Sequence, residues 1–459
     1  MLSLATPVVI AEIGWVSMQI VDTLIVGQLG ADAIGAVGLA GALFIAVGVF
    51  AMGLLLGLDP LVAQAFGARQ IDECHRWLVA GVWLAILAAV PIMGAVYVLN
   101  VTLPMWGLPP GVLVLAQPYL SVLAWSLPPL LLYVAFRRYL QAMNIVRPVT
   151  ITLIAANVVN AAANWLLVFG NMGAPNLGVP GSAYATLAAR VLMALSLLVV
   201  ILRHERNMTP RLSATPRALD VARVRRLVQL GLPAGGQMAF EVGVFATASA
   251  LAGRVSANAL AAHQIAINMA ALTFMVPLGL SSAAAVRVGQ AIGRRDPRGA
   301  VREGWIAIAL GVGFMATAAA VFLAIPGPLM RAFTKDESVV TVGVGLLFVA
   351  AVFQLFDGVQ GVTTGALRGL GDTRTAMLWN LGAHWCIGLP LGYVLCFHAG
   401  FGVTGLWWGL STGLVICGVG VLAAWRRKGT VLAPRCAGAC DGRQDEPSRS
   451  GRRSDAAES

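Results

Sequence analysis

The sequence predicts an all-α protein that crosses a membrane twelve times, built as two six-helix bundles related by a pseudo-two-fold axis along the membrane normal. Three observations predict this fold class: the composition, the length of the apolar runs and the distribution of positive charge. Of the 459 residues, 58% are hydrophobic and 11% are charged, whereas a soluble domain carries about 25% charged residues. A soluble enzyme, a disordered chain and a secreted disulfide scaffold are therefore excluded.

Apolar runs of membrane-spanning length recur along the chain, since an α-helix needs roughly 20 apolar residues to cross the hydrocarbon core. Transmembrane β-strands do not fit, because the runs are too long and lack period-two alternation. The predicted spans are residues 4–26, 36–58, 77–99, 115–142, 149–169, 180–202, 230–252, 259–286, 304–325, 339–366, 376–397 and 403–425.

The positive charges alternate between loops in the way that twelve spans require. The loops after even-numbered spans hold 19 of the 31 Lys and Arg residues, and the loops after odd-numbered spans hold three. Because loops with excess Lys and Arg face the cytoplasm, we expect both termini to be cytoplasmic. This rule also explains the net charge of +11. No nucleic-acid binding is expected, because no basic patch is interleaved with exposed aromatic residues.

The chain repeats itself at an offset of 226 residues. Pro7 matches Pro233, and QAFGARQ at 64–70 matches QAIGRRD at 290–296. Parallel six-helix repeats place a substrate path between the halves. The predicted organisation is an N-terminal bundle at 1–202, a cytoplasmic Arg-rich linker at 203–226, a C-terminal bundle at 227–425 and a disordered cytoplasmic tail at 426–459.

Carboxylates in the predicted spans are the strongest functional signal, since one at the bilayer centre costs about 2.5–3.5 kcal/mol or more. Only Arg190 and Arg137 are available as partners within spans or at their rims, and we expect Arg190 to pair with Asp22 or Glu12. Most of these acids should therefore lack a permanent ion pair and take a proton or a metal cation. The acids are Glu12, Asp22, Asp59, Glu241 and Asp357.

Polar residues spaced three or four apart share one helix face and form stripes on four spans. The stripes are Gln19 and Asp22; Gln237 and Glu241; Gln354, Asp357 and Gln360; and Asn157, Asn160 and Asn164. Such stripes favour a polar cavity between helices. The alternative is polar packing between helices, which is common in membrane bundles and needs no charge.

No catalytic Ser/His/Asp or Cys/His constellation and no metal-binding set of cysteines stands out in the sequence, so we expect a protein that is not an enzyme and needs no cofactor. An integral membrane enzyme or a receptor is the rival class. It would need a reactive constellation or a ligand-binding ectodomain, and the predicted outward loops are short.

Four motifs in order resemble the multidrug and toxic compound extrusion (MATE) family, and most closely its bacterial NorM-type branch. They are VDTLIVGQLG at 21–30, VAQAFGA at 62–68, PAGGQMAFEVGVFA at 233–246 and FDGVQGVTTGALRGLGDTRT at 356–375. The resemblance covers residues 1–425. It implies a V-shaped pair of bundles with alternating access. It also implies a secondary active antiporter of the bacterial inner membrane that exports cationic, amphipathic drugs in exchange for sodium ions or protons. We expect a monomer in the lipid bilayer.

The resemblance also implies residue roles. Asp22 matches the acidic position of the first helix, and Asn160, Asn164 and Thr186 resemble its partners in a cation site that could hold sodium. Pro7 matches the proline at which helix 1 bends. The set expected to bind substrate or coupling cation is Asp22, Asn160, Asn164, Thr186, Gln237, Glu241, Phe353 and Asp357.

Glu241 and Asp357 resemble the carboxylate pair of the NorM-type branch, and two positions depart from the family pattern. Asn164 stands where some relatives have Asp, and Phe353 stands where some have Tyr. The alternative function is a flippase or exporter of lipid-linked or polysaccharide substrates on a related fold. Such proteins usually have more spans and a strongly cationic cavity, whereas acids predominate here.

Overall fold

The structure is a computed structural model that describes residues 1–206, 208 and 210–432, and within these residues it is built from helices without strands. The first half of the chain forms α1 (Leu2–Val26), α2 (Ala31–Leu54), α3 (Leu58–Gly67), α4 (Ile71–Thr102), α5 (Pro110–Ala124), α6 (Leu127–Ala142), α7 (Arg147–Phe169) and α8 (Val179–Glu205). The second half forms α9 (Val221–Val255), α10 (Ala257–Gly293), α11 (Pro297–Ala324), α12 (Pro326–Arg331), α13 (Glu337–Gly369), α14 (Arg374–Asn380), α15 (Leu389–Tyr393) and α16 (Gly402–Leu432).

The predicted spans are confirmed in number and order. Among the described residues, eleven helical segments are long and apolar enough to cross a membrane, and the bent pair α5–α6 brings the number to twelve. The bend between α5 and α6 is 46°, where the sequence predicts one span at 115–142. Pro128 and Pro129 at the start of α6 lack the N–H groups that would continue the helical hydrogen bonds.

Two other spans are less regular than predicted. The second continues from α2 through a 3₁₀ turn at Leu55–Gly57 into α3, so that the helical segment runs over 37 residues. The eleventh contains π-helical stretches at Leu381–Gly388 and Val394–His398, on either side of α15. Pro390 lies at the start of α15 and provides no N–H, which accounts for irregular hydrogen bonding there.

Helix ends differ from the predicted linker and tail boundaries. α8 extends to Glu205, and α9 begins at Val221 with Asp220 as its N-cap, so both ends of the predicted linker are helical. α16 extends to Leu432, and the first part of the predicted disordered tail is therefore helical. The rest of that predicted tail, residues 433–459, lies outside the described residues.

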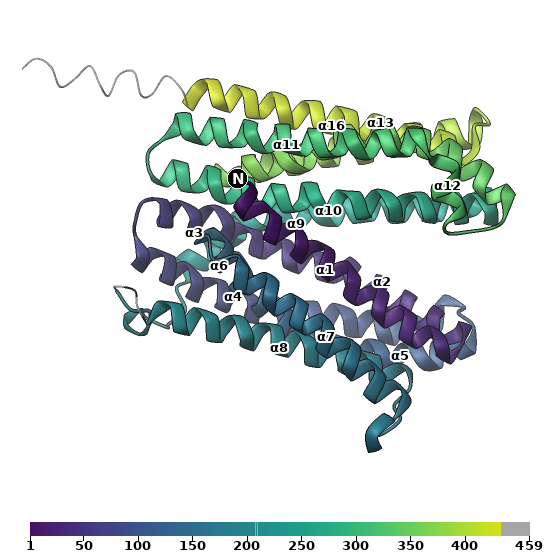
Figure 1. The fold of residues 1–459 in the computed structure, drawn as a ribbon, viewed down its shortest axis with the longest axis horizontal. Helices are drawn as coiled ribbons and strands as arrows, with labels where there is room; N and C mark the ends of the chain where they lie inside the picture. Colours follow the sequence, from purple (N-terminus) through teal and green to yellow (C-terminus); the bar gives the residue numbers. More distant parts are fainter. Residues whose placement is uncertain (207, 209, 433–459) are drawn as a thin grey trace, which may run out of the picture.

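The two halves lie side by side along their helices, with α1–α8 below and α9–α16 above in Figure 1. They meet most closely through glycines at one end of the molecule. A side chain at Gly53 would collide with the backbone of Gly235, and one at Gly67 would collide with that of Gln290. We call this end, formed by the last turn of α2, by α3, by the N-terminal half of α9 and by the last turns of α10, the closed end.

Candidate functional site

A cluster of buried polar side chains surrounds Asp22 in the first half. Asn164 on α7 donates its Nδ2 to Asp22 Oδ1 at 2.7 Å, and Thr186 on α8 donates its hydroxyl to Oδ2 at 3.0 Å. Asn160 lies one turn before Asn164, and all four residues are buried. The structure therefore brings together the four residues expected to form the cation site.

The same cluster holds unpaired oxygen atoms, as a sodium site would require. The side-chain oxygens of Asn160 and Asn164 are buried and have no hydrogen-bond partner among the described residues. Together with the Asp22 carboxylate they provide the oxygen ligands that hard cations prefer. Helices α1 and α7 supply these atoms, and their chemistry fits a sodium ion as a transported species.

Arg190 does not form the expected ion pair. Within the described part of the chain neither Asp22 nor Glu12 is its ion-pair partner. Its guanidinium instead donates to the Ser126 hydroxyl and lies 4.6 Å from the ring centre of Phe44. A cation held over an aromatic ring is stabilised by the ring quadrupole, which explains how an arginine is accommodated at this depth.

The second half holds Glu241 on α9 and Asp357 on α13, close enough for their charges to interact. The side-chain amides of Gln237 and Gln360 lie beside the Glu241 carboxylate. Over residues 1–206, 208 and 210–432, neither acid forms an ion pair with Lys, Arg or His. Gln237 is buried, Asp357 is 6% exposed and Glu241 is more accessible. Two acids without an ion-pair partner among the described residues thus lie near each other, one on α9 and one on α13.

Phe353 lies one turn from Asp357 but belongs to an aromatic cluster. Its ring centre is 5.8 Å from that of Trp407 and 6.1 Å from that of Phe245, and the residue is 2% exposed. In this conformation the Phe353 ring packs against other rings and is almost fully buried, so it is not open to a bound cation. Cys417 on α16, which the sequence did not single out, is buried near both acids.

Some residues of the polar stripes join neighbouring helices and others lie beside the buried acids, so each of the two alternatives that the sequence left open applies to part of the stripes. Asn157 donates to the Gly14 carbonyl of α1 at 3.0 Å, and Gln354 donates to the Thr273 hydroxyl of α10. These two residues join neighbouring helices, as the packing alternative requires. Asn160 and Asn164 instead face Asp22, and Gln360 faces Glu241.

Two of the five membrane acids have ion-pair partners, and the other three have none among the described residues. Glu12 pairs with Arg137 of α6. Asp59 of α3 pairs with Arg368 of α13 at 3.1 Å and with Arg138 of α6 at 3.6 Å. Arg137 and Arg138 both lie within α6.

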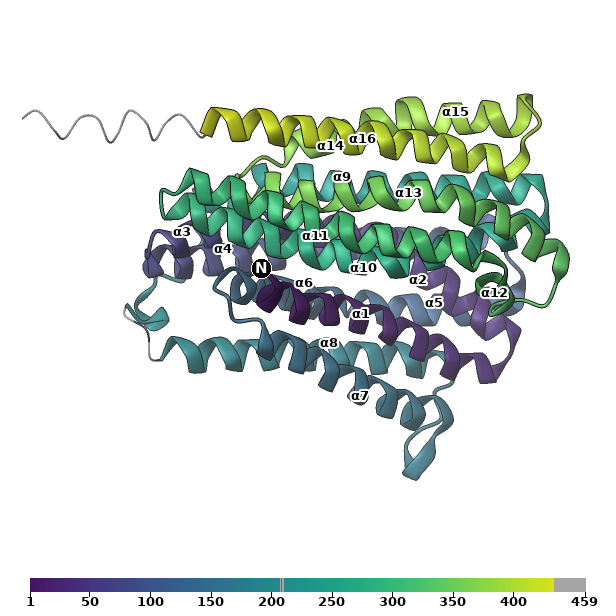
Figure 2. The same ribbon diagram turned by 45° about the horizontal axis from the view of Figure 1, so that its top comes forward.

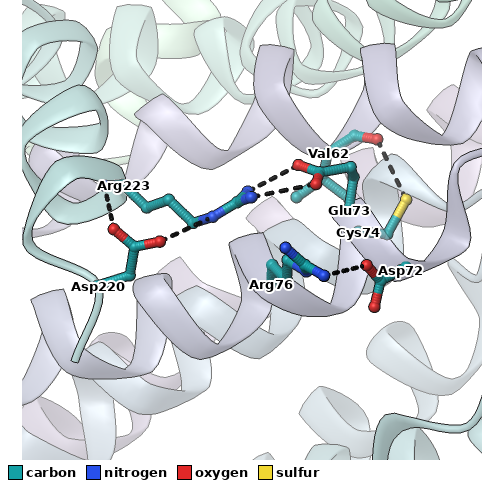
Figure 3. A network of polar contacts seen from close by, with 7 residues as sticks. All are labelled: Val62, Asp72, Glu73, Cys74, Arg76, Asp220 and Arg223. Atoms are coloured by element: carbon teal, nitrogen blue, oxygen red, sulfur yellow. Dashed lines mark hydrogen bonds and ion pairs between the residues drawn. The ribbon is translucent and has the colours of Figure 1, made fainter. Parts of the chain in front are cut away.

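The Asp59–Arg368 pair crosses between the halves at the closed end, and further polar contacts accompany it. Arg223 on α9 donates to both oxygens of Glu73 on α4, at 2.7 and 3.0 Å, and to Asp220 at 3.1 Å (Figure 3). The hydrogen bond from the Arg223 backbone N–H holds the pKa of the Asp220 carboxyl below its usual range. Gln290 donates to the Ala142 carbonyl at 2.8 Å. Charges and backbone contacts thus hold the halves together at this end.

Pro7 lies inside α1, which continues through it without a break. The Pro7 carbonyl accepts a hydrogen bond from the Thr150 hydroxyl of α7 at 2.8 Å. A proline leaves a carbonyl without its helical donor, and Thr150 provides a substitute. Bending at Pro7 stays a prediction.

Three comparisons bear on the family. The sequence model of the MatE family matches residues 7–166 and 233–394, two segments whose starts lie 226 residues apart. A "Probable multidrug resistance protein NorM" of Mesorhizobium japonicum is 37% identical over 440 residues, covering 94% of each chain. A "Multidrug resistance protein NorM" of Burkholderia vietnamiensis is 36% identical over 94% of this chain and 95% of its own.

A similar fold occurs in a solved structure described as "Outward-facing conformation of a multidrug resistance MATE family transporter of the MOP superfamily". It superimposes with a TM-score of 0.86 over 94% of this chain and 96% of its own, at 18% identity. At that identity the likeness concerns the fold, which is the one predicted from the apolar runs.

Proposed function

The chain belongs to the MatE family, and on that premise we propose that it is a secondary active multidrug transporter. It exports cationic, amphipathic molecules in exchange for sodium ions or protons. It acts in the bacterial inner membrane with both termini in the cytoplasm. The relatives named as multidrug resistance proteins support the substrate class, and the acids support the positive charge of the substrate.

The observation that carries this proposal is the pair Glu241 and Asp357. Two neighbouring carboxylates without an ion-pair partner among the described residues attract cations. A cationic drug and a coupling cation can therefore occupy the same negative charge in turn. Binding of the coupling cation then releases the drug.

The conformation supports the direction of exchange. The closed end holds the loops that follow even-numbered spans, which the positive-inside rule assigns to the cytoplasm. In this scheme we infer that the halves separate toward the outside, where the coupling cation enters and the drug leaves. Rocking to the inward-open state has to break the contacts of Arg368 with Asp59 and of Arg223 with Glu73.

The Asp22 cluster is the second cation site in this scheme, and its oxygen atoms suit sodium. A ligand shifts a two-state equilibrium only by its differential affinity for the two states, so the ion and the drug must prefer different states or exclude each other. One charge that moves inward through 100 mV provides about 2.3 kcal/mol, roughly a 50-fold drug gradient.

Purified full-length protein in liposomes loaded with ethidium, a cationic dye, tests the proposal. We expect dye movement against its gradient when a sodium or a proton gradient of the correct polarity is imposed, and none when both are collapsed. Dye movement that ignores both gradients would remove the antiport mechanism. Transfer of a lipid-linked oligosaccharide in place of the dye would favour the flippase alternative.

Thiol labelling tests the orientation. The labelling background replaces Cys386, the exposed cysteine among the described residues, and also Cys436 and Cys440, by Ser. In this background we expect Arg254→Cys at the end of α9 to react with an impermeant reagent from outside the cell. Arg217→Cys, in the connection between the halves, should react only after the membrane is opened. Both positions are exposed. The reverse labelling pattern would overturn the assignment of both termini to the cytoplasm.

A further inference from the structure

An apolar groove lies on the outside of the second half, between α14 and α16. These helices lie side by side along one edge of the molecule (Figure 2). The cavity there has a volume of about 780 Å³, and Ile416, Val419 and Ala423 contribute to its apolar lining. Both helices belong to membrane-spanning segments, so hydrocarbon, and not water, is the surrounding medium.

Small residues create the hollow. The indole ring of Trp379 lies directly on Gly420, where a Cβ would collide with it. Ala423 and Ala424 continue the depression along α16 toward its C-terminal end. Trp379 is 41% exposed and Val419 is 53% exposed, so the walls are open to an acyl chain that lies along the helix.

One end of the groove is positively charged. Arg427 and Lys428 line it there. Lys428 is already paired with Asp372 at 2.7 Å. Burial raises the pKa of the Asp372 carboxyl, but the interactions with Lys428 and the hydrogen bonds from Thr375 together outweigh burial and hold the pKa below its usual range. Arg427 is exposed and has no ion-pair partner within the part of the chain that the structure describes, which leaves its charge available.

A second cavity of about 380 Å³ adjoins this end and is lined by Arg226, Arg374 and Lys428. An apolar groove that ends at several cations is complementary in shape and charge to a phospholipid with a negative headgroup. Basic pockets at the ends of transmembrane helices bind such headgroups. A zwitterionic lipid would fill the groove equally well but would gain less from the cations.

We propose that the groove between α14 and α16 is a binding site for one anionic phospholipid, with an acyl chain along Val419 and Ala423 and the phosphate at Arg427. The bound chain covers the apolar wall of Trp379 and stabilises the contact of this irregular eleventh span with α16. This site is separate from the carboxylates proposed to bind drug and cation.

Native mass spectrometry of the full-length protein released from detergent tests the site, with palmitoyl-oleoyl phosphatidylglycerol and the matching phosphatidylcholine as probes. We expect retention of one phosphatidylglycerol in preference to phosphatidylcholine. Arg427→Gln should lower phosphatidylglycerol retention about fivefold, the effect of one cation near a membrane surface, and leave phosphatidylcholine unchanged. Ala423→Phe, which fills the groove, should lower the retention of both lipids.

Two exposed positions on α11 provide matched controls. Val301 lies close to Gly429 of α16, and its neighbour Arg302 is exposed. Arg302→Gln therefore removes a charge at the same end of the molecule but outside the groove. Ala320→Phe adds a ring on an exposed face of α11. Both should retain lipid as the wild type does. Equal losses in Arg302→Gln and Arg427→Gln, or equal retention of the two lipids by the wild type, would overturn the proposal.

Discussion

Replacing Asp357 by Asn, or Glu241 by Gln, is expected to abolish drug export while the protein still accumulates in the membrane. Each amide keeps the size of the acid and loses its negative charge. Neither acid forms an ion pair in the described residues, so no buried cation is left without its partner. The fold should therefore tolerate the change, in contrast to the loss of a paired acid.

The measurement is dye export from liposomes and drug resistance in cells, each normalised to the amount of protein. Liposomes that contain the wild-type protein should sustain a dye gradient of roughly 50-fold for each net charge that moves inward at 100 mV. Liposomes that contain either variant should sustain none. Glu303→Gln is the matched control, because it makes the same change on α11, away from the pair. Full export by either Asp357→Asn or Glu241→Gln would exclude that residue from the exchange.

Asp22→Asn tests the cation site of the first half separately from the acid pair of the second half. If coupling depends on the oxygen cluster of the first half, this variant should lose its response to a sodium gradient, because the amide removes the only formal charge among Asp22, Asn160, Asn164 and Thr186. Loss in Asp22→Asn together with full activity in the Glu241 and Asp357 variants would move the coupling site to the first half.

The twelve spans could be predicted because lipid leaves few choices. A backbone inside a bilayer must satisfy its own hydrogen bonds, so long apolar runs become helices. The acids could be singled out for the same reason, since each costs free energy at that depth. The break between α5 and α6 also has a local signal, the adjacent prolines Pro128 and Pro129.

The ion pairs could not be predicted, because sequence spacing does not say which distant helices touch. Glu12 and Arg137 are 125 positions apart, and Asp59 and Arg368 meet only because α3 and α13 pack across the two halves. Periodicity places a residue on a helix face but does not name the neighbour. For that reason Asp22, Asp59 and Glu12 look alike in the sequence and differ in the structure.

Replacing Asp59 by Asn should be the most destabilising single change among the buried pairs. The Asp59 side chain is 1% exposed and faces two arginines, Arg368 at 9% and Arg138 at 13%. Its loss leaves two buried cations without compensation, and breaking a buried pair costs about 3–5 kcal/mol. Arg368→Gln should cost less, because Asp59 then keeps Arg138.

Thermal unfolding of the full-length protein in detergent measures this order. We expect the midpoint to fall most for Asp59→Asn and less for Arg368→Gln. Glu337→Gln is the control, since it breaks the exposed Arg331–Glu337 pair, and exposed pairs contribute about 0–1 kcal/mol.

The Asp59–Arg368 pair also joins the two halves at the closed end. Asp59→Asn should therefore raise the thiol reactivity of a Cys introduced at buried Ala63, which lies against Gly289. Equal midpoints for Asp59→Asn and Glu337→Gln, with no gain in labelling, would mean that the pair does not hold the closed end together.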